Sequence, residues 1–232
     1  MPKRTLMAVG AHIGDMELSC GGVLAAHALR GDHIITVALT GGEKGNPPHL
    51  SVADYRRQKE DEAKAFAERL RGEAIVFPYP DGELTDDDTV CFELCDVIRK
   101  YKPTVVMTHW GGSIHKDHEA ASQIVKKACF YAALPGFVRD LPPHFAKGPY
   151  FAENWEDPFQ FEPYVYVVVS EEGFELWNEA IKTHWFAINS PSFSYQAYYA
   201  HLMAIRGIEI HQPYAQAFDV SPMEKRLVLP SF

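Results

Sequence analysis

Histidines and aspartates form two groups in this sequence whose residue types suit metal chemistry. One group holds His12 and Asp15, just after a short apolar run, and the other lies between His109 and His118, after a second such run. Imidazole nitrogens with one carboxylate suit Zn²⁺ or a related metal, and a ligand position left open would make the site catalytic. Residue types alone also allow a structural interpretation, in which Asp15 caps a helix and the histidines belong to the core.

The hydrophobic pattern predicts a scaffold that brings the two groups together. Short apolar runs typical of buried strands alternate with segments of helical periodicity. The predicted strands are 5–10, 34–39, 74–77 and 104–108, and the predicted helices are 18–30, 52–70, 90–100 and 118–130. Such alternation predicts βαβ units, and hence an α/β fold with a parallel sheet covered on both faces. Loops after parallel strands share one edge of the sheet, so both groups should lie there.

The second half of the chain is less regular. Residues 134–163 are rich in proline, glycine and aromatic side chains, which predicts a long irregular excursion. A strand at 164–169 and helices at 173–188 and 193–205 should follow. No shift in composition divides the chain, so we expect a single domain over residues 1–232.

Composition restricts the class of partner and the compartment. The net charge is −9 over 232 residues and no cluster of Lys or Arg stands out, which argues against a nucleic-acid partner. Apolar runs stop well short of the ~18 residues that a membrane span needs. The run at 5–10 is too short for a signal peptide, and four cysteines without a CxxC pair indicate reduced thiols. We therefore expect a cytoplasmic protein without a membrane span.

Five stretches of the chain carry, in order, a resemblance to one family. They are Ala11 to Glu17 with the following Cys20-Gly21-Gly22, Thr40 to Gly45, Arg57 to Glu60, Pro80 to Leu84, and His115-Lys-Asp-His118. The chain resembles the LmbE-like, or PIG-L, family of zinc-dependent de-N-acetylases, whose members act on N-acetylglucosaminyl lipids and related amides. The resemblance covers about residues 5–130.

This resemblance implies a fold, a cofactor and a reaction. The fold would be a Rossmann-like parallel sheet flanked by helices, and the cofactor a Zn²⁺ ion bound by His12, Asp15 and His118. The reaction would be removal of an N-acyl group, N-acetyl above all, from an amino-sugar-like or related small polar amide. Zinc lowers the pKa of bound water toward ~7 and polarises the amide carbonyl, so this chemistry suits neutral pH.

Three further residues receive roles by the same resemblance. His115 would lie beside the metal and stabilise the oxyanion or protonate the departing amine. Asp117 is placed to orient an imidazole, a task that carboxylates near metals commonly perform. Arg57 would contact the polar part of the small-molecule N-acylated substrate.

The chain departs from the family pattern at Gly14, where the family carries the aspartate taken as general base. Another acid, such as Glu17, Asp117 or Glu43, would replace it, or the metal and His115 would suffice. Alternatively, the protein is a degenerate member that binds zinc and a ligand with little or no turnover. Loss of a positioned base typically lowers rates by ~10²–10⁴, so activity need not vanish. A nucleotide binder with structural histidines is a further alternative.

Aromatic residues near the C-terminal end bear on assembly. Phe193, Tyr195, Tyr198 and Tyr199 have near-helical spacing, which favours packing in the core or in a homo-oligomer over a platform for a sugar ring. His184 lies beside aromatic residues and is expected to be a core histidine. The oligomeric state stays open.

Overall fold

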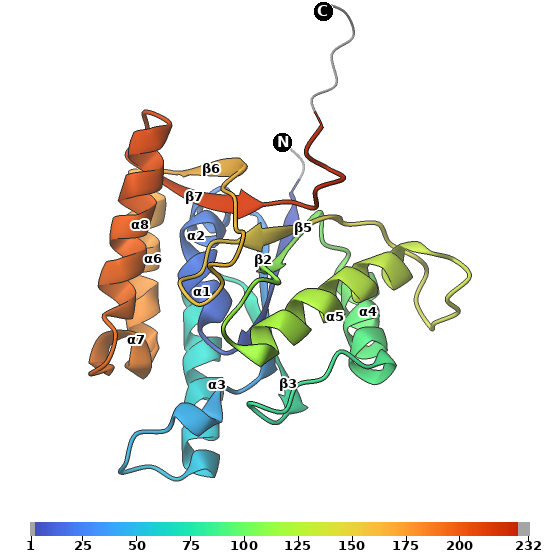
Figure 1. The fold of residues 1–232 in the computed structure, drawn as a ribbon, viewed down its shortest axis with the longest axis horizontal. Coiled ribbons are helices and arrows are strands. Elements are labelled where there is room, and N and C mark those ends of the chain that lie inside the picture. Colours follow the sequence, from blue (N-terminus) through green and yellow to red (C-terminus); the bar gives the residue numbers. More distant parts are fainter. Residues whose placement is uncertain (1–2, 227–232) are drawn as a thin grey trace, which may run out of the picture.

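A seven-stranded sheet runs through the centre of the computed structural model, which describes residues 3–226 (Figure 1). Its strands, in the order β3-β2-β1-β4-β5-β7-β6, are β1 (Thr5–His12), β2 (His33–Thr40), β3 (Glu73–Tyr79), β4 (Val105–His109), β5 (Lys147–Ala152), β6 (Val165–Val169) and β7 (Tyr214–Asp219). Strands β1 to β5 pair in parallel, whereas β7 runs antiparallel to β5 and β6. The predicted Rossmann-like α/β fold is confirmed, with β7 as the antiparallel exception.

Helices cover both faces of this sheet, as Figure 1 shows with α6, α7 and α8 on one side and α4 and α5 on the other. The helices are α1 (Asp15–Ser19), α2 (Gly21–Leu29), α3 (Val52–Arg69), α4 (Asp88–Tyr101), α5 (Lys116–Ala133), α6 (Glu171–Ala180), α7 (Trp185–Asn189) and α8 (Tyr195–Glu209), with short 3₁₀ turns η1 (Glu43–Gly45) and η2 (Ile181–Thr183).

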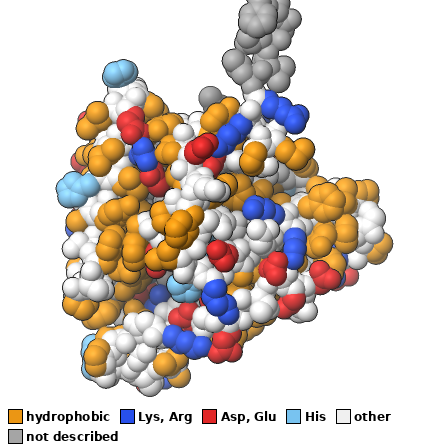
Figure 2. Space-filling model, in the orientation of Figure 1, with side chains coloured by type: hydrophobic (Ala, Val, Ile, Leu, Met, Phe, Trp, Pro, Cys, Tyr) orange, Lys and Arg blue, Asp and Glu red, His pale blue; other side chains and the backbone are white. Residues whose placement is uncertain are grey.

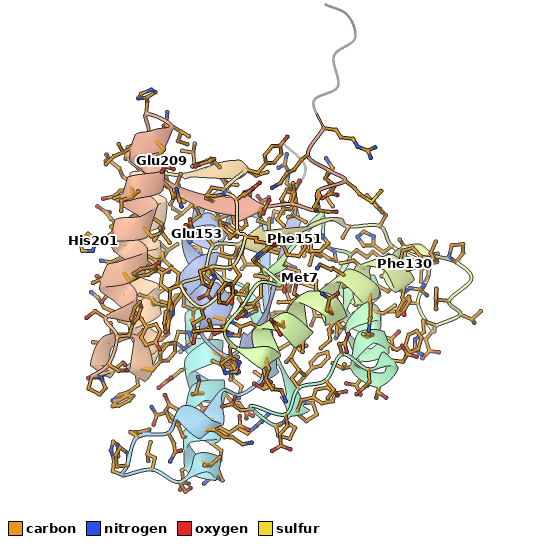
Figure 3. All side chains as sticks on the ribbon, viewed as in Figure 1. Met7, Phe130, Phe151, Glu153, His201 and Glu209 are labelled. Atoms are coloured by element: carbon orange, nitrogen blue, oxygen red, sulfur yellow. The ribbon has the colours of Figure 1, made fainter. Side chains whose placement is uncertain are left out.

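The two faces of the sheet bury two separate apolar cores. Leu6 and Ala8 of β1 belong to one core, together with Trp177 of α6, and Met7 and Val9 belong to the other. Successive side chains of a strand point to opposite faces, so a strand buried on both faces reads as a continuous apolar run. In Figure 3, Met7 lies in the interior, whereas His201 projects outward from α8.

Residues 134–163 are less irregular than predicted, because they contain β5. Only the short run Tyr150-Phe-Ala152 is apolar, and Pro149 precedes it, so the local pattern is too weak to identify a strand. Pairing with β4 on one side and β7 on the other supplies the missing backbone hydrogen bonds. Strand β7 itself falls in a stretch where the sequence shows little pattern.

The helix predicted at 173–188 is also divided, into α6, η2 and α7. The break falls at His184, whose backbone is extended, with φ −84° and ψ 110°. The His184 side chain is fully buried and packs against Phe66, with ring centroids 5.6 Å apart, so its prediction as a core histidine is confirmed.

The surface view agrees with the mixed charge of the sequence. Figure 2 shows Lys and Arg side chains interspersed with Asp and Glu across the visible face. Over residues 3–226, none of the helices combines the length and the apolar character needed to cross a membrane.

Candidate metal centre

The two histidine groups meet at the carboxyl edge of the sheet, as predicted. Strand β1 ends at His12 and its parallel neighbour β4 ends at His109. After β1 the chain turns through Gly14, whose φ of 106° suits glycine, and enters α1 at Asp15. Asp15 is therefore not the N-cap of this helix. Its Oδ2 atom instead accepts a hydrogen bond from the His12 backbone N–H, at 2.8 Å.

His12, Asp15 and His118 lie close enough to share one ion. Oδ2 of Asp15 is 3.1 Å from Nδ1 of His12 and 3.5 Å from Nε2 of His118. One ligand atom from each residue lies within 4.8 Å of those of the other two. The structure thus brings together the three side chains that the sequence singled out as ligands.

Two imidazole nitrogens in this cluster, Nε2 of His12 and Nε2 of His118, are buried without a hydrogen-bond partner among the described residues, although Oδ1 of Asp81 lies 3.2 Å from the first. Nε2 of His118 is buried and makes no hydrogen bond within the described part of the chain, while Nδ1 lies 2.9 Å from Oδ1 of Asp157. A buried polar atom without a partner is costly, and native structures rarely leave one. A histidine that donates Nδ1–H to a carboxylate and keeps Nε2 free has the arrangement typical of a metal ligand. Two imidazoles and one carboxylate fit Zn²⁺.

Asp157 links the histidines of this cluster. Its two carboxylate oxygens each lie 2.9 Å from an Nδ1 atom, one of His109 and one of His118. Nε2 of His109 lies in turn 3.1 Å from Oδ2 of Asp15. Asp157 follows β5 inside the segment predicted to be irregular, so sequence reasoning missed it. Identification of β5 as a neighbour of β4 would have placed Asp157 at the same edge of the sheet.

Electrostatics separate the two histidines bound to Asp157. Burial opposes the charged form of His109, but the charges of Asp157 and Asp15 outweigh it and raise its pKa to about 9. Burial, together with the charge of His109, lowers the pKa of His118 to about 4. Burial also acts to raise the pKa of Asp157, yet the two histidines hold it well below its usual range. At neutral pH, His118 is accordingly the uncharged member of the pair.

His115 and Asp117 both lie beside the cluster. The His115 ring lines the adjoining cavity, with its centroid 4.7 Å from that of His12 and 4.9 Å from that of His118. Nδ1 of His115 accepts a hydrogen bond from the Asp117 backbone N–H. The buried Asp117 side chain accepts from the Gly82 N–H at 2.7 Å and lies 3.5 Å from Nε2 of His12. Asp117 thus lies beside Nε2 of His12, as does Asp81, whose Oδ1 is 3.2 Å from that nitrogen.

Arg57 lies away from this site. Its side chain is 70% exposed and pairs with Asp54, one turn earlier on α3. Tyr55 and Lys59 lie four residues apart and so share the buried face of the helix. Arg57 lies midway between them in sequence and therefore points to a different face. Of the described residues that line the cavity, Lys59 is the only Lys or Arg.

Two acids considered as replacements for the missing aspartate have structural partners. Oε2 of Glu17 accepts a hydrogen bond from the Gly14 N–H at 3.1 Å. Glu43 accepts from the Asp81 N–H at 3.1 Å and pairs with Arg56. Neither side chain lines the cavity.

Glu156, which the sequence did not single out, does line the cavity. Its Oε2 atom is 3.9 Å from Nε2 of His118, and 24% of the side chain is exposed. Burial, with the charges of Asp15 and Asp157, raises the pKa of Glu156 to about 7.

The cavity has a volume of about 680 Å³ and opens directly onto His12, Asp15 and His115. Its far wall is aromatic, and the side chains that form it are Tyr55, Trp155, Trp185, Phe186, Tyr195 and Tyr199. Phe193 stacks on Trp155, with ring centroids 4.5 Å apart. Tyr195 and Tyr199, which were expected to pack in the core or in an oligomer, thus line the cavity. The space would hold a small ligand with an apolar or ring-shaped part.

Comparison with known proteins agrees with this picture. The curated 4-oxalmesaconate hydratase of Pseudomonas putida is 28% identical over 167 residues, which are 67% of this chain and 65% of that protein. The 1D-myo-inositol 2-acetamido-2-deoxy-alpha-D-glucopyranoside deacetylase of Streptomyces griseus is 28% identical over 176 residues, 63% of this chain and 55% of its own. The alignments thus span less than two thirds of either relative.

A solved structure is similar over the whole chain. The crystal structure of a conserved protein from Thermus thermophilus has a TM-score of 0.82 and 25% identity, and the match covers 99% of each chain. The family model described as GlcNAc-PI de-N-acetylase, PIG-L, matches residues 7–129, which include His12, Asp15, His115 and His118. With more than half of its length matched by that model, this chain belongs to the PIG-L family.

Proposed function

We propose that this protein is a zinc-dependent hydrolase that removes an N-acyl group, N-acetyl above all, from an amino-sugar-like or related small polar amide. The observation that carries the proposal is the buried, unpartnered Nε2 of His118, clustered with His12 and Asp15, two residues that line the cavity. These three side chains would hold the metal. Zinc, when bound, supplies a Lewis acid for the amide carbonyl and a means of activating water.

His115 would act on the substrate carbonyl. Because Nδ1 accepts the Asp117 N–H, the neutral ring carries its proton on Nε2. Burial and the neighbouring His12 lower the pKa of His115, which favours this neutral form at pH 7. The ring lines the cavity and would donate Nε2–H to the oxygen on which negative charge develops.

Glu156 is the carboxylate that we assign as proton acceptor from the attacking water. Gly14 cannot fill this role, and Glu17 and Glu43 are held by backbone N–H groups away from the cavity. Glu156 faces the cavity on the side of His118. Glu156 lies in the segment after β5, whereas the family carries its base in the motif that follows β1.

Replacement of Glu156 by glutamine should lower kcat by ~10²–10⁴, the range typical for loss of a general base, with zinc content unchanged. The amide keeps the shape of the side chain but cannot accept a proton from water. Steady-state kinetics with metal analysis would measure both quantities. Glu162→Gln, in the same segment with its side chain 78% exposed, is the matched control. Full activity of Glu156→Gln would remove Glu156 from the mechanism.

Replacement of Asp157 by asparagine should weaken zinc binding by ~10–100-fold, the usual effect of losing a carboxylate that orients a ligand. An amide offers one acceptor oxygen where the carboxylate serves both His109 and His118. Competition for zinc against a chromophoric chelator would give the affinity directly. Asp61→Asn, on the exposed face of α3, should bind zinc as the unmodified protein does. Equal affinity in Asp157→Asn would refute the orienting role.

A second candidate reaction is hydration of a carbon–carbon double bond. It is favoured by the similarity to the hydratase of Pseudomonas putida. Both reactions activate water beside a polarised carbonyl, so the same side chains would serve. A zinc-binding protein with little or no turnover is the third outcome.

One assay separates these candidates. Protein purified without a histidine tag is loaded with zinc and tested for acetate release from a panel of N-acetyl sugars and N-acetyl amino acids, and for loss of ultraviolet absorbance with unsaturated keto acids. We expect zinc-dependent acetate release that is absent in His118→Ala. Loss of absorbance without acetate release would favour the hydratase. Protein that stays metal-free after zinc addition would refute every zinc-dependent candidate.

A further inference from the structure

A buried ammonium group lies at the cavity of the candidate site. Lys59 of α3 is only 6% exposed, yet it contributes to the cavity lining. Its Nζ atom makes one hydrogen bond, to the Gly42 carbonyl oxygen at 3.3 Å. Among residues 3–226, no carboxylate oxygen is within 4.0 Å of this Nζ atom. An ammonium carries three donors, so Lys59 has capacity to spare on the cavity side.

The remaining surroundings of Lys59 are largely aromatic. Nζ lies 4.8 Å from the ring centroid of Phe186 and 5.6 Å from that of Tyr55. Trp185 also lines this part of the cavity. Lysine is almost never buried to this degree unless its charge is paired. The aromatic faces offset part of the desolvation but leave the donors unused.

The neighbouring Arg56, in contrast, has partners within the protein for its side-chain donors. The guanidinium of Arg56 donates to the carbonyl oxygens of Phe77 and Tyr79 and pairs with Glu43 and Glu60. Its donors are therefore satisfied by the protein itself. Lys59 differs from Arg56 because no carboxylate of the described residues pairs with its ammonium group.

Acidic groups around the site maintain the charge of Lys59 without bonding to it. Burial lowers its pKa, whereas Asp15, Asp81, Glu62 and Glu17 favour the charged form. A purely structural ion pair would place one of these carboxylates on Nζ. The observed arrangement instead leaves a charged donor among the residues that line the cavity.

We infer that Lys59 binds a carboxylate of the substrate, so the compound processed in this cavity is an N-acylated acid rather than a neutral sugar. The inference rests on the proposed function, since it names the substrate class of the same cavity. A buried charged donor gains more from a carboxylate than from a neutral hydroxyl. A neutral ligand would leave the ammonium without a directly bonded counter-charge.

The test measures binding separately from turnover. N-acetylglycine and its homologues with longer chains are each paired with the neutral carboxamide and titrated calorimetrically into the zinc-loaded protein under conditions of no detectable hydrolysis. For at least one chain length, we expect the acid to bind ~10-fold more tightly than the carboxamide, or about 1.4 kcal/mol. In Lys59→Met this preference should fall below ~3-fold, which is under about 0.7 kcal/mol. Lys59→Arg should retain most of it.

Lys64→Met is the matched control, because Lys64 lies on the same helix with its side chain 64% exposed. Equal affinity for acid and carboxamide in the unmodified protein at every chain length would overturn the inference. A preference that persists in folded Lys59→Met would also overturn it, because the carboxylate would then be bound elsewhere, for example by the metal. If Lys59→Met does not fold, a crystal structure with the acid decides by the presence or absence of its carboxylate at Nζ.

Turnover is then measured on the same pairs of compounds. Preference for the acid without hydrolysis by the zinc-loaded protein would leave the anion site standing and remove the proposed function. Hydrolysis of neutral amides without any preference for the acid would support the proposed function and remove the anion site.

Discussion

Under the proposed function, replacing His118 by alanine should remove both zinc binding and hydrolysis. The variant keeps two of the three donors but loses Nε2 of His118, a buried atom that makes no hydrogen bond within the described residues. Loss of the Lewis acid removes several kcal/mol of transition-state stabilisation, so kcat/KM should fall by ~10³ or more. Metal analysis of the purified variant and acetate-release kinetics measure the two effects.

The control for this variant is His201→Ala. His201 is exposed on α8 and points away from the sheet, as Figure 3 shows. It should retain zinc and activity. Circular dichroism and thermal unfolding must show that His118→Ala is folded, because the substitution also removes a partner of the buried Asp157. A folded His118→Ala that binds zinc stoichiometrically and turns over substrate would refute the proposed ligand set.

Gly14→Asp restores the carboxylate that the family pattern carries, yet it should destabilise the protein rather than activate it. Gly14 has φ 106°, and a Cβ atom there would lie 2.4 Å from Cζ of Phe186. The left-handed backbone costs a non-glycine residue about 1–2 kcal/mol, and overpacking adds about 1–3 kcal/mol. The free energy of unfolding should thus fall by about 2–5 kcal/mol, measured by urea denaturation.

Two alanine variants separate these contributions. Gly31 also has a positive φ, 83°, but a Cβ atom there meets nothing within 4 Å. Gly31→Ala should therefore show the backbone cost alone, and Gly14→Ala should show that cost plus the contact with Phe186. If Gly14→Ala is no less stable than Gly31→Ala, the contact with Phe186 is not the obstacle. A stable, more active Gly14→Asp would mean that the site still lacks its base.

The geometry at Gly14 leaves little room for the aspartate that the family pattern carries there. Phe186 of α7 occupies the space that the side chain of an aspartate would need. The Phe186 ring of the aromatic wall therefore packs directly against the Gly14 backbone in the turn before α1. Under the proposed function, Glu156 supplies the carboxylate from the other side of the site.

Local pattern determined the first half of the fold. Strands β1 to β4 are short apolar runs separated by amphipathic helices, and this alternation is visible in the sequence because each element buries its own residues. Strands β5 and β7 were not predicted. Their pairing joins segments more than sixty residues apart, as in the register of Phe151 with Asp219, and neither segment has a strong period of its own.

Sequence pattern alone placed His12, Asp15 and His118 at one edge of a sheet, because His12 and Asp15 follow one predicted parallel strand and His118 begins the helix after another. It did not determine which side chain of α3 faces the cavity. Arg57 and Lys59 are two residues apart, about 200° around the helix, and only packing against the sheet decides which one turns inward. Asp157 and Glu156 came from tertiary structure as well, because their contacts with His118 cross 39 and 38 residues of chain.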